Sequence, residues 1–153
     1  MVHTRHVLRP DGSNLGVLGE LMPWIREGVL NEDAESAALH EELEVDPHDL
    51  IVEKPRFGAF YGTDLEQTLR KQGTDTLIIS GISTPVCCDT TAREATSRDF
   101  RVLFLSDGTA TAGSGAAPLQ KATLEIVNDT FAQVLTIEET RRKISHAVSD
   151  TTV

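Results

Sequence analysis

Cys87 is the residue of this chain best placed for covalent chemistry. It lies within residues 81–95, directly after the apolar run 76–79, so it falls where a strand passes into a helix. Thr84 is suited to cap that helix and Pro85 is favoured at its first position, which places Cys87 in the first turn. Backbone N–H groups there have no intrahelical partner, and the helix dipole favours the thiolate, the nucleophilic form of cysteine.

The neighbouring thiol has a different interpretation. A free cysteine is most often a small buried hydrophobic residue, and this alternative is preferred for Cys88, which points roughly 100° away from Cys87 around the helix. The two cysteines are adjacent in sequence, a spacing that suits neither a structural disulfide nor a zinc site. The sequence therefore predicts free thiols and a reducing compartment.

Lys54 is the second candidate for chemistry. It ends a predicted strand at residues 50–54, and Pro55 prevents that strand from continuing into a helix. In a parallel sheet the functional groups gather at the carboxyl ends of the strands, and both Lys54 and the turn before Cys87 lie at such ends. Most lysines are solvated surface groups, however, and from the residues alone that alternative is favoured for Lys54.

These segments resemble the signature of the isochorismatase-like cysteine hydrolases, a family that includes isochorismatase, nicotinamidase and amidohydrolases acting on carbamoyl or ureido compounds. The marker residues here are Gly81, Thr84, Cys87, Thr91, Ala92, Arg93 and Ala95. Residues 53–65 resemble the family segment that carries its essential lysine, and residues 107–110 resemble the acidic loop after the next strand. The resemblance covers residues 3–136 and favours a catalytic role for Lys54 over a surface role.

The resemblance implies a mechanism. Cys87 would attack the carbonyl carbon of a small amide or ureido compound and form a thioester, while Lys54 stabilises charge. It also implies a cis peptide bond between Ile82 and Ser83, and an oxyanion hole formed by the backbone N–H groups of Ser83 and Cys87. The carbamoyl and ureido amidohydrolases are the favoured subfamily, because residues 6–16 resemble theirs more than those of isochorismatase, which cleaves an enol ether.

Five residues are candidates for substrate contact. Arg56 can bind a carboxylate through two parallel hydrogen bonds, with a surface arginine as the equal alternative. Phe57, Phe60 and Tyr61 can wall a small pocket, although aromatic residues near a sheet end are more often part of the core. Thr84, the threonine of the signature, is the fifth.

Neither a metal nor a cofactor is expected. His3 and His6 are separated by two residues, but the Asp and two His ligands of nicotinamidases have no match in spacing, so a pair of strand-end histidines is preferred. The glycine-rich residues 108–115 lack the Lys-Ser/Thr ending of a phosphate-binding loop.

The elements that position these residues alternate between strand and helix. The pattern predicts strands near residues 2–7, 50–54, 76–80, 101–105 and 133–136, and helices at 33–43, between Thr63 and Gly73, at 85–97, at 118–131 and from 138. This alternation implies an α/β fold with a mainly parallel sheet covered on both faces. The resemblance specifies a single three-layer α-β-α domain of Rossmann-like strand order, residues 1–153.

The family's first strand, which carries its catalytic aspartate, has no counterpart in this sequence. Residues 2–6 resemble the family's second strand, so roughly 25 to 30 residues are expected to be missing from the front. Either Met1 is an internal start in a longer natural chain, or the protein is a truncated relative without the catalytic base. Asp11 lies in a predicted loop, and Asp107 is expected to orient the site or cap a loop. Neither is an evident substitute for the catalytic base, so low activity is expected of the chain as given.

Composition limits the classes of partner that the protein is expected to bind. The 14 Lys and Arg residues against 24 Asp and Glu give a net charge of −10, which disfavours nucleic acid and anionic membrane surfaces. No apolar run approaches the roughly 18 residues of a membrane span. The protein is expected to be cytoplasmic, to form a homodimer or homotetramer and to act on a small molecule. The rival hypothesis is a non-catalytic family member that serves as an oligomeric or binding protein.

Overall fold

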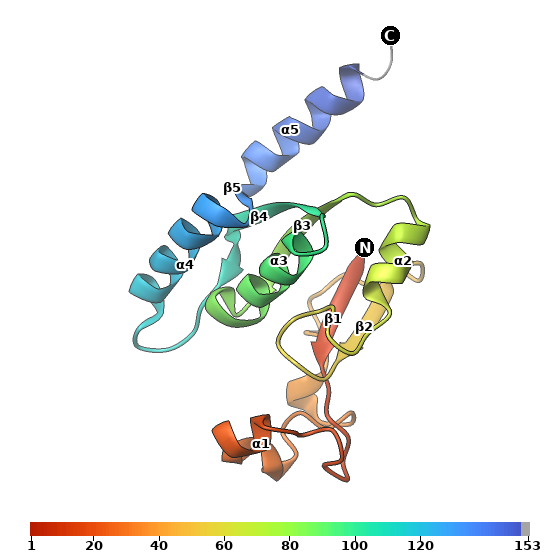
Figure 1. Cartoon of the computed structure of the whole chain (residues 1–153), viewed down its shortest axis with the longest axis vertical. Coiled ribbons are helices and arrows are strands. Elements are labelled where there is room, and N and C mark those ends of the chain that lie inside the picture. The colour runs from red at the N-terminus through yellow and green to blue at the C-terminus, as the bar shows by residue number, and fades with distance from the viewer. Residues whose placement is uncertain (151–153) are drawn as a thin grey trace. The chain divides into compact units, whose positions relative to one another are not determined.

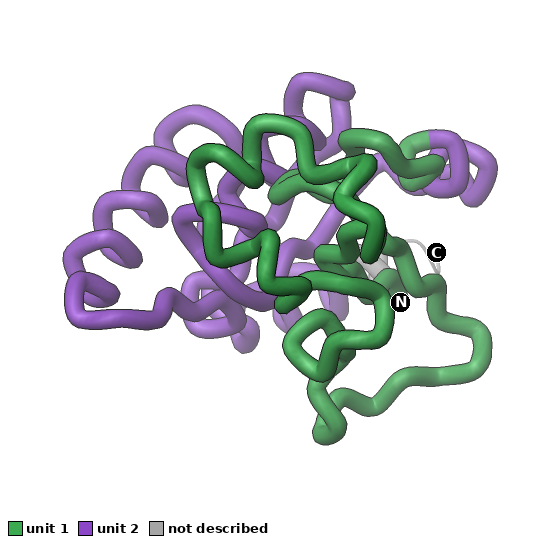
Figure 2. The backbone as a smooth tube through the Cα atoms, turned by 90° about the horizontal axis from the view of Figure 1, so that it is seen from below, with its two compact units in different colours: residues 1–66 green, residues 67–153 purple. Residues whose placement is uncertain are grey.

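The computed structural model describes residues 1–150, with side chains described through residue 146 (Figure 1). The chain forms two compact units, residues 1–66 and 67–153 (Figure 2). Each named strand pairs in parallel with its neighbour, and the strands form one sheet of two strands and one of three. The fold is therefore α/β with parallel sheets, as the alternation of strand and helix predicted.

The first unit is built on the parallel pair β1 (Val2–His6) and β2 (Leu50–Lys54). Its register runs from Val2 opposite Leu50 to His6 opposite Lys54. At the amino-terminal end of the pair, the Nε2 atom of His3 lies 3.0 Å from the Oδ2 atom of Asp49, the residue before β2. This contact holds the two strands in the register that aligns their carboxyl ends.

The long connection between β1 and β2 has little regular structure. It contains the short helix α1 (Leu18–Leu21) and two 3₁₀ helices, Pro23–Glu27 and Glu35–Ala37. Leu8, Leu18 and Ile25 form a small buried core, and Leu15, Met22, Leu30 and Phe57 pack around it. This apolar cluster, rather than helical hydrogen bonding, organises the segment.

The helix predicted at residues 33–43 is wrong. Only Glu35–Ala37 forms a 3₁₀ turn, and Ala38 already has an extended backbone. A short helix in water depends on burying its apolar face, but 49% of the Leu43 surface remains exposed. The spacing of Leu39 and Leu43 was compatible with a helix, but Leu43 buries only about half of its surface, which is too little to stabilise that face.

The second unit contains the sheet β3 (Thr76–Ile82), β4 (Arg101–Ala110) and β5 (Gln133–Leu135), in that order. The helix α2 (Leu65–Lys71) leads into it, with the Thr63 hydroxyl oxygen accepting from the Leu65 N–H at 3.4 Å. The helices α3 (Asp89–Thr96) and α4 (Ala116–Thr130) contact β4, and α5 (Ile137–Asp150) contacts β4 and β5. Phe104, in the central strand β4, is fully buried and anchors this core.

β4 is longer than the predicted strand 101–105. Pairing with β3 continues to Ala110, with a shift of register between Ile79 and Gly81 that marks an irregularity typical of a β-bulge. Residues 107–110, expected to form an acidic loop, therefore belong to the strand. Thr109 supports the irregularity, because its hydroxyl donates to the Leu105 carbonyl at 3.0 Å.

Asp107 caps the last helix. Its Oδ1 atom accepts a hydrogen bond from the Ile137 N–H at 2.8 Å, and Thr136 and Glu139 form a capping box around the same helix start. Of the two roles expected for Asp107, capping is the one that these contacts support. The carboxylate also interacts favourably with the positive end of the α5 dipole.

Replacing this cap should destabilise the protein. We expect Asp107→Ala to lower the free energy of unfolding by about 1 kcal/mol, because one N–H at the start of α5 loses its acceptor. Asp107→Asn keeps an acceptor and should cost less. Urea denaturation measures both, with Asp33→Ala, at an exposed loop aspartate, as the control. Equal loss in the control and in Asp107→Ala would rule out the capping role.

Candidate active site

Cys87 lies in the turn that joins β3 to α3. Thr84–Cys88 forms a single π-helical turn, in which the N–H groups of Val86 and Cys88 donate to the Ser83 carbonyl at 3.1 and 3.2 Å. The helix proper follows at Asp89. The prediction that Cys87 occupies the first turn of a helix after a strand is therefore confirmed.

The predicted cap at Thr84 is wrong. Ser83, with an extended backbone, occupies the N-cap position, and no side chain caps the turn. The turn begins one residue earlier than predicted, so Thr84 is its first residue and its side chain faces inward, fully buried. Its hydroxyl oxygen has no hydrogen-bond partner among the described residues.

The backbone before the turn agrees with the resemblance. The peptide bond between Ile82 and Ser83 is cis, as predicted. Gly81 has φ of +120°, a conformation that residues with a side chain rarely adopt, although the space around it is open. Backbone conformation, and not lack of room, therefore explains the glycine of the signature.

Other signature residues hold α3 in place. Ala92 and Ala95 are fully buried, so their small side chains let the helix approach the sheet closely. The Thr91 hydroxyl donates to the Cys87 carbonyl at 2.7 Å. The Arg93 guanidinium donates to Asp89 at 2.8 Å and lies 4.2 Å from the centre of the Phe131 ring. These contacts fix the helix on which Cys87 depends.

The two thiols have different exposure. Cys88 is 4% exposed and belongs to the core, as predicted, whereas Cys87 is half-buried. Neither forms a disulfide. Cys87 is therefore the thiol that a small molecule can reach more readily.

Lys54 is buried, which excludes the surface alternative. It ends β2, is 3% exposed, and its Nζ atom donates to the carbonyl oxygens of Arg56 at 3.0 Å and Phe57 at 2.8 Å. A buried ammonium group requires such partners, because charge is costly to remove from water. The chain turning back after β2 supplies the carbonyls, so the position of the cation depends on the shape of residues 55–58.

The candidate substrate contacts of the first unit lie in different environments. Arg56 donates to the Asn14 carbonyl at 2.9 Å and its guanidinium lies 5.8 Å from the centre of the Tyr61 ring. Phe57 packs on the small core and Phe60 is buried, whereas Tyr61 is 58% exposed. Lys54, Arg56 and Phe57 thus form one neighbourhood within residues 1–66, and Ser83, Thr84 and Cys87 form another within residues 67–153.

His6 was missed as a site candidate. It lies opposite Lys54 in the register of β1 and β2 and contacts Phe57 edge-on, with ring centres 5.8 Å apart and an interplanar angle of 84°. Burial, reinforced by the positive charge of Lys54, lowers the pKa of His6 to about 4. The only signal in the sequence was that His6 and Lys54 both lie at the ends of predicted strands, and this places them side by side only when the register of the two strands is known.

This shift predicts how stability depends on pH. Because the folded pKa lies below the ordinary 6.5, the unfolded chain binds more protons between pH 6.5 and about 4, so stability falls as the pH drops through that window. Such a shift represents about 3 kcal/mol, which partial exposure reduces to the order of 2 kcal/mol. Urea unfolding at a series of pH values should show a shallower dependence for His6→Gln. Identical curves for the two proteins would contradict the assignment.

The two histidines of the N-terminal strand do not act together. His3 contacts Asp49 at the opposite end of the strand, and an odd separation places the two side chains on opposite faces of the sheet. Among the described residues, no three His, Cys, Asp or Glu side chains gather as a metal site would require. None of the helices formed by the described residues is long and apolar enough to cross a membrane.

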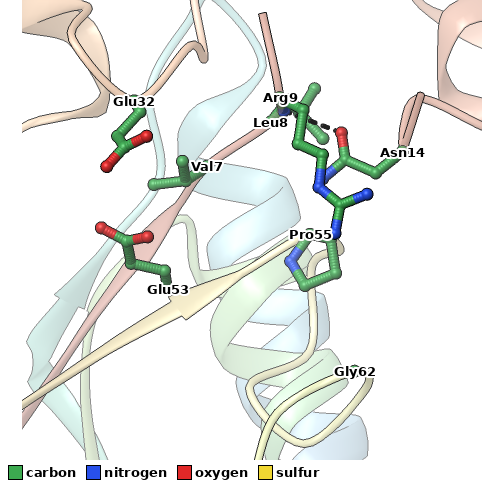
Figure 3. Close-up of a pocket in the computed structure, with 8 residues that line it drawn as sticks. All are labelled: Val7, Leu8, Arg9, Asn14, Glu32, Glu53, Pro55 and Gly62. Atoms are coloured by element: carbon green, nitrogen blue, oxygen red, sulfur yellow. Dashed lines mark hydrogen bonds between the residues drawn. The ribbon is translucent and has the colours of Figure 1, made fainter. Parts of the chain in front are cut away.

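A separate pocket of about 380 Å³ opens in the first unit (Figure 3). Its lining residues are Val7, Leu8, Arg9, Asn14, Glu32, Glu53, Pro55 and Gly62. Glu32 and Glu53 point toward one another on one side, and the Arg9 side chain lies on the other beside Pro55 (Figure 3). Side chains alternate along a strand, so Glu53 faces away from Lys54, and this pocket does not include the lysine.

Comparison with known proteins identifies the family. Residues 1–139 match the isochorismatase domain. The chain is 35% identical over 131 residues to nicotinamidase 3 of Arabidopsis thaliana, covering 84% of this chain and 63% of that protein. It is 34% identical over 114 residues to the ureidoacrylate amidohydrolase RutB of Methylorubrum extorquens, covering 74% of this chain and 45% of that protein. The chain thus spans less than two thirds of the length of either relative.

A solved structure is also similar. The cysteine hydrolase from Pseudomonas syringae pv. phaseolicola superposes with a TM-score of 0.88 at 34% sequence identity, over 95% of this chain and 72% of that one. The match to the isochorismatase domain extends over the turn that carries Cys87 and the strand end that carries Lys54. This chain belongs to the isochorismatase-like cysteine hydrolase family.

Proposed function

We propose that this protein is an amidohydrolase that cleaves the C–N bond of a small amide or ureido compound through a thioester on Cys87. The observation that carries the proposal is the position of Cys87, half-buried in the first turn after β3, within a chain of this family. The relatives named nicotinamidase and ureidoacrylate amidohydrolase support an amide or ureido substrate.

The reaction proceeds in two halves. The Cys87 thiolate attacks the carbonyl carbon, and the electron pair of the C=O bond moves to oxygen to form an oxyanion. The C–N bond then breaks, the nitrogen takes up a proton and leaves as ammonia, and a thioester remains. Water attacks that thioester, releasing the acid and restoring the thiol, so the overall change is amide plus water to acid plus ammonia.

Two backbone N–H groups and Lys54 are proposed to stabilise the negative charge of the oxyanion. The N–H groups of Ser83 and Cys87 are the proposed donors to the oxyanion, and such preorganised donors are typically worth about 10²- to 10³-fold each in rate. Lys54 supplies positive charge held in one place by the Arg56 and Phe57 carbonyls. The resemblance assigns the proton transfers to an aspartate on the family's first strand.

Recognition of the rest of the substrate is proposed for the residues after β2. Arg56 is the candidate for a substrate carboxylate, since its guanidinium is already oriented by the Asn14 carbonyl. Tyr61 offers an exposed aromatic surface beside it. Phe57, Phe60 and Thr84 are buried or partly buried and would shape the walls rather than contact solvent. The substrate is a small molecule in this proposal, and the protein a cytoplasmic homo-oligomer.

The rival hypothesis from the sequence is the second candidate function. In it the protein binds small molecules, or assembles with copies of itself, without turnover. In that case Cys87 would remain an accessible thiol but would not accumulate an acyl group.

One experiment separates the two functions. Ammonia release is measured with a panel of small primary amides and ureido acids, both for this chain and for a form extended by any reading frame upstream of Met1. Mass spectrometry of quenched reactions tests for an acyl group on the peptide that contains Cys87. Turnover with a Cys87 adduct supports the hydrolase, and ligand binding without ammonia or adduct supports the binding protein.

A further inference from the structure

The neighbourhood of Lys54 contains a second polar group that the proposed mechanism does not use. His6 is the last residue of β1 and is paired with Lys54, the last residue of β2. Register partners in a parallel pair project from the same face of the sheet. The His6 ring therefore lies on the same face of the strand pair as the Lys54 ammonium, and it packs edge-on against Phe57.

The surroundings of the ring favour one tautomer. The Nε2 atom is buried and has no partner among the described residues. The backbone of Pro55 favours a proton on the ring, and because proline has no N–H, only its carbonyl can have this effect. A neutral ring with its proton on Nδ1 leaves a lone pair on the buried Nε2 atom, and this is the tautomer that we infer.

The charge state agrees with this geometry. Burial, then the nearby cation of Lys54 and that of Arg56, hold the pKa of His6 at about 4 against the opposing effect of the Pro55 carbonyl. The imidazole is therefore neutral near pH 7. Its Nε2 atom is a buried acceptor, a kind of group that folded proteins rarely leave without a donor.

We infer that the Nε2 atom of His6 accepts a hydrogen bond from an N–H group of the substrate and so selects carboxamide and ureido compounds over esters. Lys54 and Arg56 disfavour a cationic ligand at this point, because both place positive charge beside the ring. A neutral N–H donor fits, whereas an ester has none to offer. The inference rests on the proposed function for its substrate class, and His6 is a binding residue in it.

Nitrogen NMR tests the inference without turnover. In the Cys87→Ala protein, labelled with ¹⁵N-histidine, the Nε2 signal of His6 should have the shift of an unprotonated ring nitrogen near pH 7. N-carbamoylglycine carries ureido N–H groups and should move that signal in the direction of an accepted hydrogen bond. Monomethyl succinate is a matched ester with the same carboxylate and no N–H, and it should leave the signal in place.

Two results of this titration would overturn the inference. One is a protonated Nε2, which would mean that the ring already donates there. The other is an Nε2 signal that does not respond to saturating N-carbamoylglycine, or that responds equally to both compounds, as a bridging water would allow. Because Cys87→Ala cannot turn over substrate by the proposed route, this outcome is independent of whether the wild-type protein is an amidohydrolase.

Kinetics provide the second test where the wild-type protein is active. His6→Leu removes the acceptor, and His6→Gln places an amide oxygen at similar reach. For the best primary amide of the panel, KM should rise about tenfold in His6→Leu, the loss expected for one hydrogen bond, and recover in His6→Gln. For the methyl ester of the same acid, KM should not change. Equal effects on amide and ester would show that His6 only shapes the fold.

Discussion

Replacement of Cys87 by serine is expected to lower the rate of ammonia release by about 10³-fold or more. Serine keeps the shape of the turn, but a hydroxyl is far less ionised than a thiol near neutral pH and is a weaker nucleophile without a strong base. A mutation that removes the nucleophile acts on the transition state, so kcat should fall with little change in KM. Initial rates at several concentrations of the best amide measure both constants.

The adjacent cysteine provides a matched control. Cys88 differs from Cys87 in being almost completely buried, so Cys88→Ala should retain activity and lose some stability from the space left in the core. Iodoacetamide followed by peptide mass mapping should label Cys87 first in the wild-type protein. Faster labelling of Cys88, or full activity in Cys87→Ser, would contradict the assignment of the nucleophile.

Replacement of Lys54 by methionine should have the second largest effect. We expect kcat to fall by about 10²- to 10³-fold, the usual consequence of removing one charge-stabilising group from a site. Stability should fall as well, because the Arg56 and Phe57 carbonyls lose the ammonium that they both bind. An unsatisfied buried acceptor costs about 1–3 kcal/mol.

Kinetic and stability measurements together separate the two roles of Lys54. The kcat value is measured with the best amide, and the free energy of unfolding is measured by urea denaturation at the same pH. Lys121→Met, at a lysine of α4 whose side chain is 80% exposed, should change neither quantity appreciably. Unchanged kcat in Lys54→Met, with only the stability loss, would show that the buried lysine is a structural group.

Local signals in the sequence account for the correct predictions. A strand that turns into a helix was indicated by the apolar run 76–79, Gly81 and Pro85. Each of these signals affects the backbone conformation of the residues next to it, so it can be interpreted without knowing the tertiary structure. The same is true of Thr63 and Gly73 at the ends of α2. The position of Cys87 in a first helical turn follows from these signals, while the cis bond before Ser83 was implied by the resemblance.

The errors arose where local signals were ambiguous. Thr84 and Ser83 can both cap a helix, and the choice depended on which side chain the core could accept, since Thr84 is fully buried. The helix predicted at residues 33–43 had the right spacing of leucines but left Leu43 largely exposed. Periodicity predicts a helix only when another element covers its apolar face.

By itself, therefore, the sequence determined the order of the strands and of the helices from α2 onward, the parallel character of the pairing and the turn that carries Cys87. Tertiary structure decided that Lys54 is buried against the carbonyls of Arg56 and Phe57, and that His6 is paired with it and has a buried Nε2 atom without a partner among the described residues. Both facts depend on the register between β1 and β2, two strands joined by the long connection from Val7 to Asp49. No local propensity specifies such a register, because it is set by which side chains of distant segments can be buried together.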